Sequence, residues 1–177
     1  MNKMLRISVL IIIVTGFFHT ALPQADHPEP KTLAIGSKAP DFSLPGIDGK
    51  TWTLRDFSKA PVLVIIFSAN HCPTAQAYED RIISITNDYK SRGVALVMIS
   101  SNSVRTLSYS EMGYTDVGDS FEDMKYRAGD KGFNFPYLYD GDDQKCALAY
   151  GPVATPHCFV FDRDRILRYN GRIDGSE

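Results

Sequence analysis

Two continuous apolar runs, separated by one amphipathic segment, constrain the fold of this chain more than any other feature. Val62–Phe67 and Val94–Ile99 are short, rich in β-branched residues and apolar at every position, which is the pattern of strands buried on both faces. Between them, the spacing of apolar residues from Pro73 to about Arg92 predicts a helix that ends at Gly93. Strand, helix and strand in this order predict a βαβ unit with a parallel pair of strands.

Shorter elements are expected on both sides of this unit. They are an extended segment at Ser37–Leu44, a turn at Pro45–Gly49, a strand at Thr51–Leu54, an irregular stretch from Ser100 to Ser120, a helix from Phe121 to about Ala128, a strand at Tyr137–Tyr139, a short helix at Gln144–Tyr150 capped by Asp142 or Asp143, and a hairpin of Cys158–Phe161 with Ile166–Tyr169. The apolar stripe of the long helix is expected to consist of Ala77, Ile82, Ile83, Ile85 and Tyr89. The order predicts an α/β fold, a thioredoxin-like α/β/α sandwich around a central mixed sheet.

The N-terminus has the pattern of a secretory signal peptide. Lys3 and Arg6 form a basic start, Ile7–Phe18 is an apolar run, and small residues lie near Ala21 or Ala25. The apolar run is shorter than the roughly 20 residues that span a bilayer, so cleavage after residues 1–25 is favoured over a retained anchor. We therefore expect export to the periplasm or the extracellular space, with no stable membrane insertion after cleavage.

Residues 26–34 are predicted to be a polar linker and residues 35–177 one thioredoxin-like domain. A thioredoxin-like sheet normally has a C-terminal helix over one face, and none is predicted before Glu177. Either the sequence is truncated at its C-terminus or that face is covered differently. The chain has 19 Lys and Arg against 21 Asp and Glu, with no basic cluster, so nucleic acid is not an expected partner.

Three cysteines, Cys72, Cys146 and Cys158, exclude a fully paired disulfide framework because their number is odd. Cys72 lies between a buried strand and the start of a helix, where backbone N–H groups and the helix dipole stabilise a thiolate. His71 could add a positive charge or a proton relay. The alternative is that Cys72 is a small buried apolar residue. Cys158 is expected in the core, and Cys146 either packs or is exposed.

Thr155–Pro156 comes directly before the predicted strand at Cys158. An X-Pro bond is where cis peptides occur, and a proline is tolerated at the start of a strand. Pro156 therefore either faces Cys72 as a cis-proline or simply ends a loop. Spacing alone leaves both interpretations open.

Seven short motifs, in the right order, resemble the redoxin (AhpC/TSA) superfamily, and most closely its peroxiredoxin-like, thioredoxin-domain branch. They are Ala39–Leu44, Asn70–Pro73, Ala77–Arg81, Phe135–Leu138, Tyr150–Gly151, Thr155–Pro156 and Tyr169–Asp174. The resemblance implies the thioredoxin-like fold and chemistry at Cys72. It also implies that Asn70, Thr155 and Pro156 form part of the substrate-binding groove, with Asn70 orienting the loop before the cysteine.

The chain departs from the family pattern at the positions that define peroxide reduction and dithiol–disulfide exchange. The peroxide-binding Thr and Pro of peroxiredoxins are replaced by Ala69 and Ile65, and the second cysteine of a dithiol pair is replaced by Ala75 or Ala69. We therefore predict a single nucleophilic thiol, Cys72, tuned by His71. It would act on a disulfide, sulfenate or peroxide, and an external thiol would complete turnover.

Two other functions are kept open. The missing residues also suit a non-catalytic thioredoxin-fold binding module. A third possibility is a copper or zinc site formed by His71, Cys72, His157 and Cys158. Neighbouring strand residues such as His157 and Cys158 point to opposite faces, which disfavours one shared ion. The expected partners are thus protein or small-molecule thiols and disulfides and an external reductant, with no cofactor and no metal ligand set.

Overall fold

The computed structural model describes residues 31–102 and 117–175. The predicted signal peptide, residues 26–30 of the predicted linker and residues 103–116 of the predicted irregular stretch lie outside this part. Leu33 already contacts the domain, because its N–H donates to the carbonyl of Tyr150 (2.9 Å) and its carbonyl accepts from the Asn170 side chain (2.8 Å).

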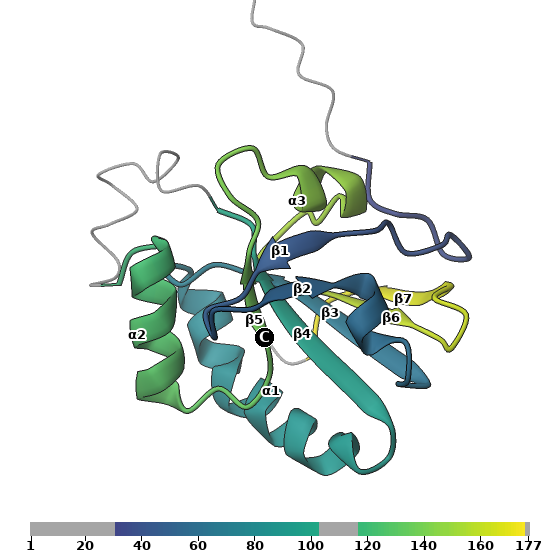
Figure 1. Cartoon of the computed structure of the whole chain (residues 1–177), viewed down its shortest axis with the longest axis horizontal. Coiled ribbons are helices and arrows are strands. Elements are labelled where there is room, and N and C mark those ends of the chain that lie inside the picture. Colours follow the sequence, from purple (N-terminus) through teal and green to yellow (C-terminus); the bar gives the residue numbers. More distant parts are fainter. Residues whose placement is uncertain (1–30, 103–116, 176–177) are drawn as a thin grey trace, which may run out of the picture.

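The elements follow in the predicted order (Figure 1). They are β1 (Ser43–Pro45), β2 (Thr51–Thr53), the 3-10 helix η1 (Leu54–Phe57), β3 (Val62–Ser68), α1 (Pro73–Lys90), β4 (Val94–Ser100), α2 (Phe121–Lys131), β5 (Tyr137–Tyr139), α3 (Lys145–Tyr150), β6 (His157–Phe161) and β7 (Leu167–Gly171). The main sheet has the order β5-β4-β3-β6-β7. Strands β3, β4 and β5 are parallel, whereas β6 runs antiparallel to both β3 and β7. The βαβ unit, the hairpin and the mixed sheet are thus confirmed.

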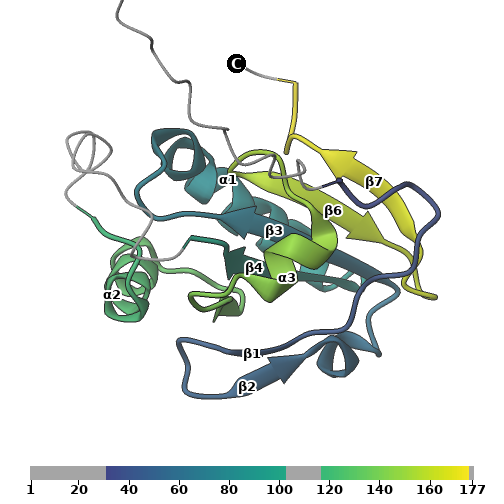
Figure 2. The ribbon, with the colours of Figure 1, turned by 90° about the horizontal axis from the view of Figure 1, so that it is seen from above.

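Each face of the sheet carries its own apolar core. Ile66, Met98 and Tyr137 pack against α1 and α2 on one face. On the other face, a second cluster around Phe67 and Phe159 is covered by the β1–β2 hairpin, η1 and α3 (Figures 1 and 2). Figure 2 also shows β7 at the edge of the sheet. Two covered faces around a mixed sheet make this the thioredoxin-like sandwich that was predicted.

The buried face of α1 differs from the predicted stripe. Its buried residues are Ala75, Glu79, Ile82 and Thr86, whereas Ala77 and Tyr89 are exposed. Two polar residues are tolerated on this face because both have partners. The Thr86 hydroxyl donates to the Ile82 carbonyl (2.8 Å), and Glu79 forms an ion pair with Arg127 of α2, with Nε–Oε1 and Nη2–Oε2 distances of 2.9 and 2.7 Å.

Two helix ends were also predicted incorrectly. Helix α2 continues past Gly129 to Lys131, and the left-handed Gly132 follows it (φ 68°). The main cap of α3 is not one of the two aspartates predicted, Asp142 or Asp143, although the Asp143 carboxylate accepts from the backbone N–H of Lys145. Instead, the carboxylate of Asp140 accepts from the backbone N–H groups of Cys146 (2.9 Å) and Ala147 (2.7 Å).

Candidate functional site

Cys72 is the N-cap residue of the 18-residue helix α1 and is partly exposed. Its backbone is extended, with φ −73° and ψ 115°, and its carbonyl accepts the first helical hydrogen bond, from Gln76 N at 3.0 Å. Pro73 follows as the first helical residue, as the sequence predicts. The sulfur is therefore attached to the backbone at the positive end of the α1 dipole.

The Cys72 sulfur also contacts the loop that leads into β6. Its S–H donates to the carbonyl oxygen of Thr155 across 3.2 Å. The Thr155–Pro156 peptide bond is cis. The structure therefore agrees with the interpretation in which Pro156 is a cis-proline and its loop lies against Cys72.

Two hollows in the surface flank this contact. One, of about 620 Å³, is lined by residues of α1, by Ala154, Thr155 and Pro156, and by the chain that follows β7. The other, of about 330 Å³, lies on the α3 side and is also lined by Ala154 and Thr155. The first hollow carries the exposed residues Ala77 and Arg172. The second carries exposed Leu148 and Val153 next to the polar residues Ser101, Asn102 and Gln144. Both hollows thus adjoin Thr155, whose carbonyl oxygen the Cys72 sulfur contacts.

Asn70 is buried and fully engaged within the protein. Its side-chain N–H donates to the Gly118 carbonyl (3.0 Å), its side-chain oxygen accepts from the Tyr137 hydroxyl (2.9 Å), and its backbone carbonyl accepts from the Gln76 side chain (2.7 Å). These contacts fix the loop before Cys72. They leave the Asn70 side chain directed at the protein rather than at a substrate.

His71 is held by a residue that the sequence did not single out. The carboxylate of Asp119 lies 2.5 Å from His71 Nδ1 and also accepts from the His71 backbone N–H (3.2 Å) and from the Asn102 side chain (3.2 Å). Asn102 comes just after β4, and β3 and β4 are parallel, so both strands deliver their following residues to one edge of the sheet. The predicted parallel pairing of these two strands is the sequence signal that could have placed Asn102 near His71.

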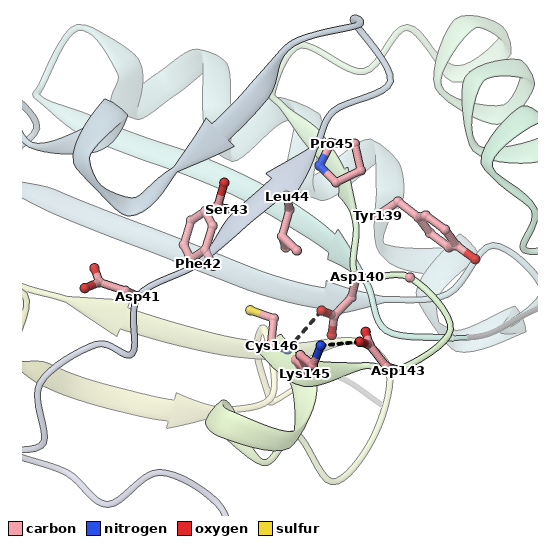
Figure 3. Close-up of a pocket in the computed structure, with 11 residues that line it drawn as sticks. Asp41, Phe42, Ser43, Leu44, Pro45, Tyr139, Asp140, Asp143, Lys145 and Cys146 are labelled. Carbon is pink, nitrogen blue, oxygen red and sulfur yellow. Dashed lines mark hydrogen bonds and ion pairs between the residues drawn. The ribbon is translucent and has the colours of Figure 1, made fainter.

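The other two cysteines are buried and remote from this chemistry. Cys146 lines a separate cavity of about 440 Å³ together with Asp140 and Lys145 (Figure 3). Burial raises the pKa of the Cys146 thiol, and the nearby Asp140 carboxylate raises it further. Burial likewise raises the pKa of Cys158 to about 12. Neither sulfur is therefore suited to act as a thiolate at neutral pH.

The structure separates two of the four residues considered for a metal site. Cys158 belongs to the core beneath α1 and α2, whereas His157 stacks on Phe159 on the other side of the sheet, with ring centroids 4.7 Å apart. One ion cannot bind both side chains. In residues 31–102 and 117–175, no group of three or more His, Cys, Asp or Glu side chains could hold a metal ion.

No helix in the described part of the chain is both long and apolar enough to cross a membrane.

Comparison with known proteins supports the same fold. A thiol-disulfide oxidoreductase ResA of Bacillus thuringiensis (strain Al Hakam) is 23% identical over 163 residues, which are 92% of this chain and 84% of that protein. The solved structure of an uncharacterized conserved protein from Geobacillus kaustophilus is 38% identical, with a TM-score of 0.72 over 81% of this chain and 71% of that one. The hypothetical protein SMc02350 from Sinorhizobium meliloti 1021 is 32% identical, with a TM-score of 0.73 over 83% and 75% of the two chains. The AhpC/TSA family matches residues 35–170, and this chain, a thioredoxin-like redoxin, belongs to that family.

Proposed function

We propose that this chain is an exported thiol-disulfide oxidoreductase that uses one nucleophilic cysteine, Cys72. The observation that carries the proposal is the position of Cys72, partly exposed at the N-terminus of α1 and hydrogen-bonded to Thr155 at the edge of two hollows. The relatives named thiol-disulfide oxidoreductase ResA support this class of substrate. Exposed apolar residues on both sides of Thr155, Ala77 in one hollow and Leu148 and Val153 in the other, support a partner that offers an extended segment.

The proposed reaction begins with the Cys72 thiolate attacking one sulfur of a partner disulfide. A bond forms between Cys72 and that sulfur, the partner's S–S bond breaks, and its second sulfur leaves as a thiolate that takes up a proton. An external thiol then attacks the Cys72 sulfur and expels the partner as a thiol. The first external thiol is now bound to Cys72 as a mixed disulfide, and a second external thiol attacks it. The bond to Cys72 breaks, Cys72 is regenerated, and the two external thiols leave as a disulfide.

An external reductant is needed because the usual positions of a second cysteine hold alanine. Ala69 and Ala75 are each only 2% exposed and pack in the protein interior. Cys146 and Cys158 are buried elsewhere. Ala69 and Ile65 also stand where peroxiredoxins have their peroxide-binding Thr and Pro, so disulfides are favoured over peroxides as substrates.

A mixed-disulfide assay tests this function. The reduced protein is incubated with a glutathionylated peptide and excess glutathione, and we expect deglutathionylation together with a glutathione adduct on Cys72 by mass spectrometry. Cys72→Ser abolishes both signals. Cys146→Ser is the matched control because it removes a buried thiol, and it retains both. Turnover by Cys72→Ser, or no adduct on the wild type, contradicts the proposal.

The buried alanines also favour a second candidate, a binding module that holds partners without turnover. Under that function, Cys72→Ser would bind the partner as tightly as the wild type does, and the thiol would be dispensable. Affinity measured for both proteins under reducing conditions, together with the assay above, separates the two functions.

Export is proposed from the N-terminal sequence alone. We expect the mature protein to begin near residue 26, and N-terminal mass analysis of the protein recovered from the cell envelope or the medium tests this. An intact Met1 on that protein would instead indicate a retained anchor.

A further inference from the structure

We propose that Asp119 is a positioning residue for the chemistry of Cys72, which acts by holding the imidazole of His71, the residue before Cys72 in the chain, as a proton-exchanging group. The inference rests on the proposed thiol chemistry of Cys72. It assigns a role to a residue that makes no contact with the sulfur itself.

Asp119 is completely buried, and each of its contacts described above comes from a donor. The His71 backbone N–H reaches Oδ1, while His71 Nδ1 and the Asn102 side-chain nitrogen reach Oδ2. A carboxylate can only accept, so His71 Nδ1 carries the hydrogen of the 2.5 Å contact. The other ring nitrogen, Nε2, is then the atom at which His71 gains or loses a proton.

This arrangement also explains how a buried carboxylate is compensated. An ionised carboxylate out of water needs hydrogen bonds and an opposite charge. His71 Nδ1 and the Asn102 side chain supply hydrogen bonds to Oδ2, and the His71 side chain is 16% exposed, so the ring reaches from the buried carboxylate to the surface. A cationic imidazole on the residue next to Cys72 favours the thiolate over the thiol.

The proton balance of the proposed reaction follows from this pair. In the proposed cycle, the proton that the leaving sulfur needs is held at His71 Nε2. When Cys72 attacks, the partner sulfur that leaves takes the Nε2 proton and His71 becomes neutral. When an external thiol later frees Cys72 as a thiolate, the proton of that thiol returns to Nε2. No proton or electron is left over in the cycle.

The same contacts could serve a purely structural purpose, because Asp119 also binds the backbone of His71 and neighbouring Gly118 binds Asn70. A double-mutant cycle separates the two roles. The second-order rate constant for alkylation of Cys72 by iodoacetamide at pH 7 is measured by peptide mass spectrometry, so that Cys146 and Cys158 do not contribute. The proteins compared are the wild type, Asp119→Asn, His71→Gln and the double variant.

If Asp119 acts through His71, Asp119→Asn slows alkylation by about threefold to tenfold, and it has no further effect when His71 is already glutamine. Asp140→Asn is the matched control: it also neutralises a buried carboxylate, but one that caps α3. It lowers stability without changing the rate. An equal slowing in both backgrounds, or no slowing at all, overturns the inference.

If Asp119→Asn does not fold, a measurement on the wild type tests the inference instead. The ¹⁵N resonances of the His71 ring should show Nδ1 protonated at all pH values at which the protein is folded, with the change confined to Nε2. A neutral ring protonated at Nε2 overturns the inference. Neither experiment uses a disulfide substrate, so positioning can be confirmed even if the mixed-disulfide assay fails.

Discussion

The Cys72 sulfur donates a hydrogen bond to the carbonyl oxygen of Thr155, although the two residues lie 83 positions apart. The contact joins the start of α1 to the loop before β6. It uses a backbone acceptor, so the identity of the residue 155 side chain matters less than the path of the loop. A sulfur in a disulfide carries no hydrogen, so this S–H contact with Thr155 is lost when Cys72 forms a mixed disulfide.

Selective labelling follows from the exposure of the three thiols. Cys72 is partly exposed, whereas Cys146 and Cys158 are buried and their pKa values are raised by burial. In the native protein at neutral pH we expect one thiol to react with Ellman's reagent within minutes, and all three after denaturation. The Cys72→Ser variant should show no fast phase. Two fast thiols in the wild type would contradict the buried positions.

Replacing Ala75 with cysteine should add an internal second thiol. Ala75 lies in the first turn of α1, three residues after Cys72, and is almost fully buried. We expect Ala75→Cys to lose two hydrogen masses on mild oxidation, and its mixed disulfides to resolve without external thiol. Ser84→Cys, on an exposed part of the same helix, is the control and should still need external thiol. The extra sulfur should cost about 1 kcal/mol of stability.

Breaking the Glu79–Arg127 ion pair should be severe because Glu79 is buried and Arg127 is largely shielded, with side-chain exposures of 7% and 12%. Arg127→Met leaves the Glu79 carboxylate unpaired, and we expect a loss of about 3 kcal/mol in the free energy of unfolding, measured with urea. Replacing both residues by apolar ones should cost less than Arg127→Met alone. Lys125→Ala, which removes an exposed pair with Glu122, should cost less than about 0.5 kcal/mol. Equal losses for Arg127→Met and Lys125→Ala would refute this expectation.

Mild acid should destabilise the protein through His157. Burial lowers the pKa of His157, whose Nδ1 accepts from the backbone N–H of Val153 (3.2 Å). Below the ordinary histidine pKa of about 6.5 the unfolded chain therefore binds a proton that the folded protein resists, and stability falls as the pH is lowered. Urea unfolding at pH 7.5 and pH 5.0 should show a larger loss for the wild type than for His157→Gln. Identical losses would exclude His157 as a contributor.

Most of the sheet could be predicted because its strands have patterns that only a buried strand satisfies. The runs that became β3 and β4 are apolar at nearly every position, which leaves no solvent face to assign. The face of α1 could not be predicted in this way. Glu79 and Thr86 count as polar in any periodic pattern, and they become acceptable on the buried face only through partners such as Arg127, which lies 48 residues away.

The residues of the site likewise differ in how far they could be predicted from local sequence. Cys72 and Pro156 were proposed from local signals, a strand-to-helix junction and an X-Pro pair, and the structure brings their loops together. No local sequence pattern marked Asp119 as a functional residue. It precedes a helix-capping sequence that explains Ser120 and Asp123 but not Asp119. Its contact with His71 depends on how α2 packs against the edge of the sheet. No short stretch of sequence contains that information.

The buried pair of Glu79 and Arg127 has a consequence for how relatives of this chain can diverge. A lineage that changes either residue alone passes through a protein with an unpaired buried charge, whereas an apolar pair of similar volume fills the same space. The two positions should therefore change together, with homologues carrying either both charges or neither. Wherever both are lost, helices α1 and α2 are expected to be joined by apolar side chains at the same two positions.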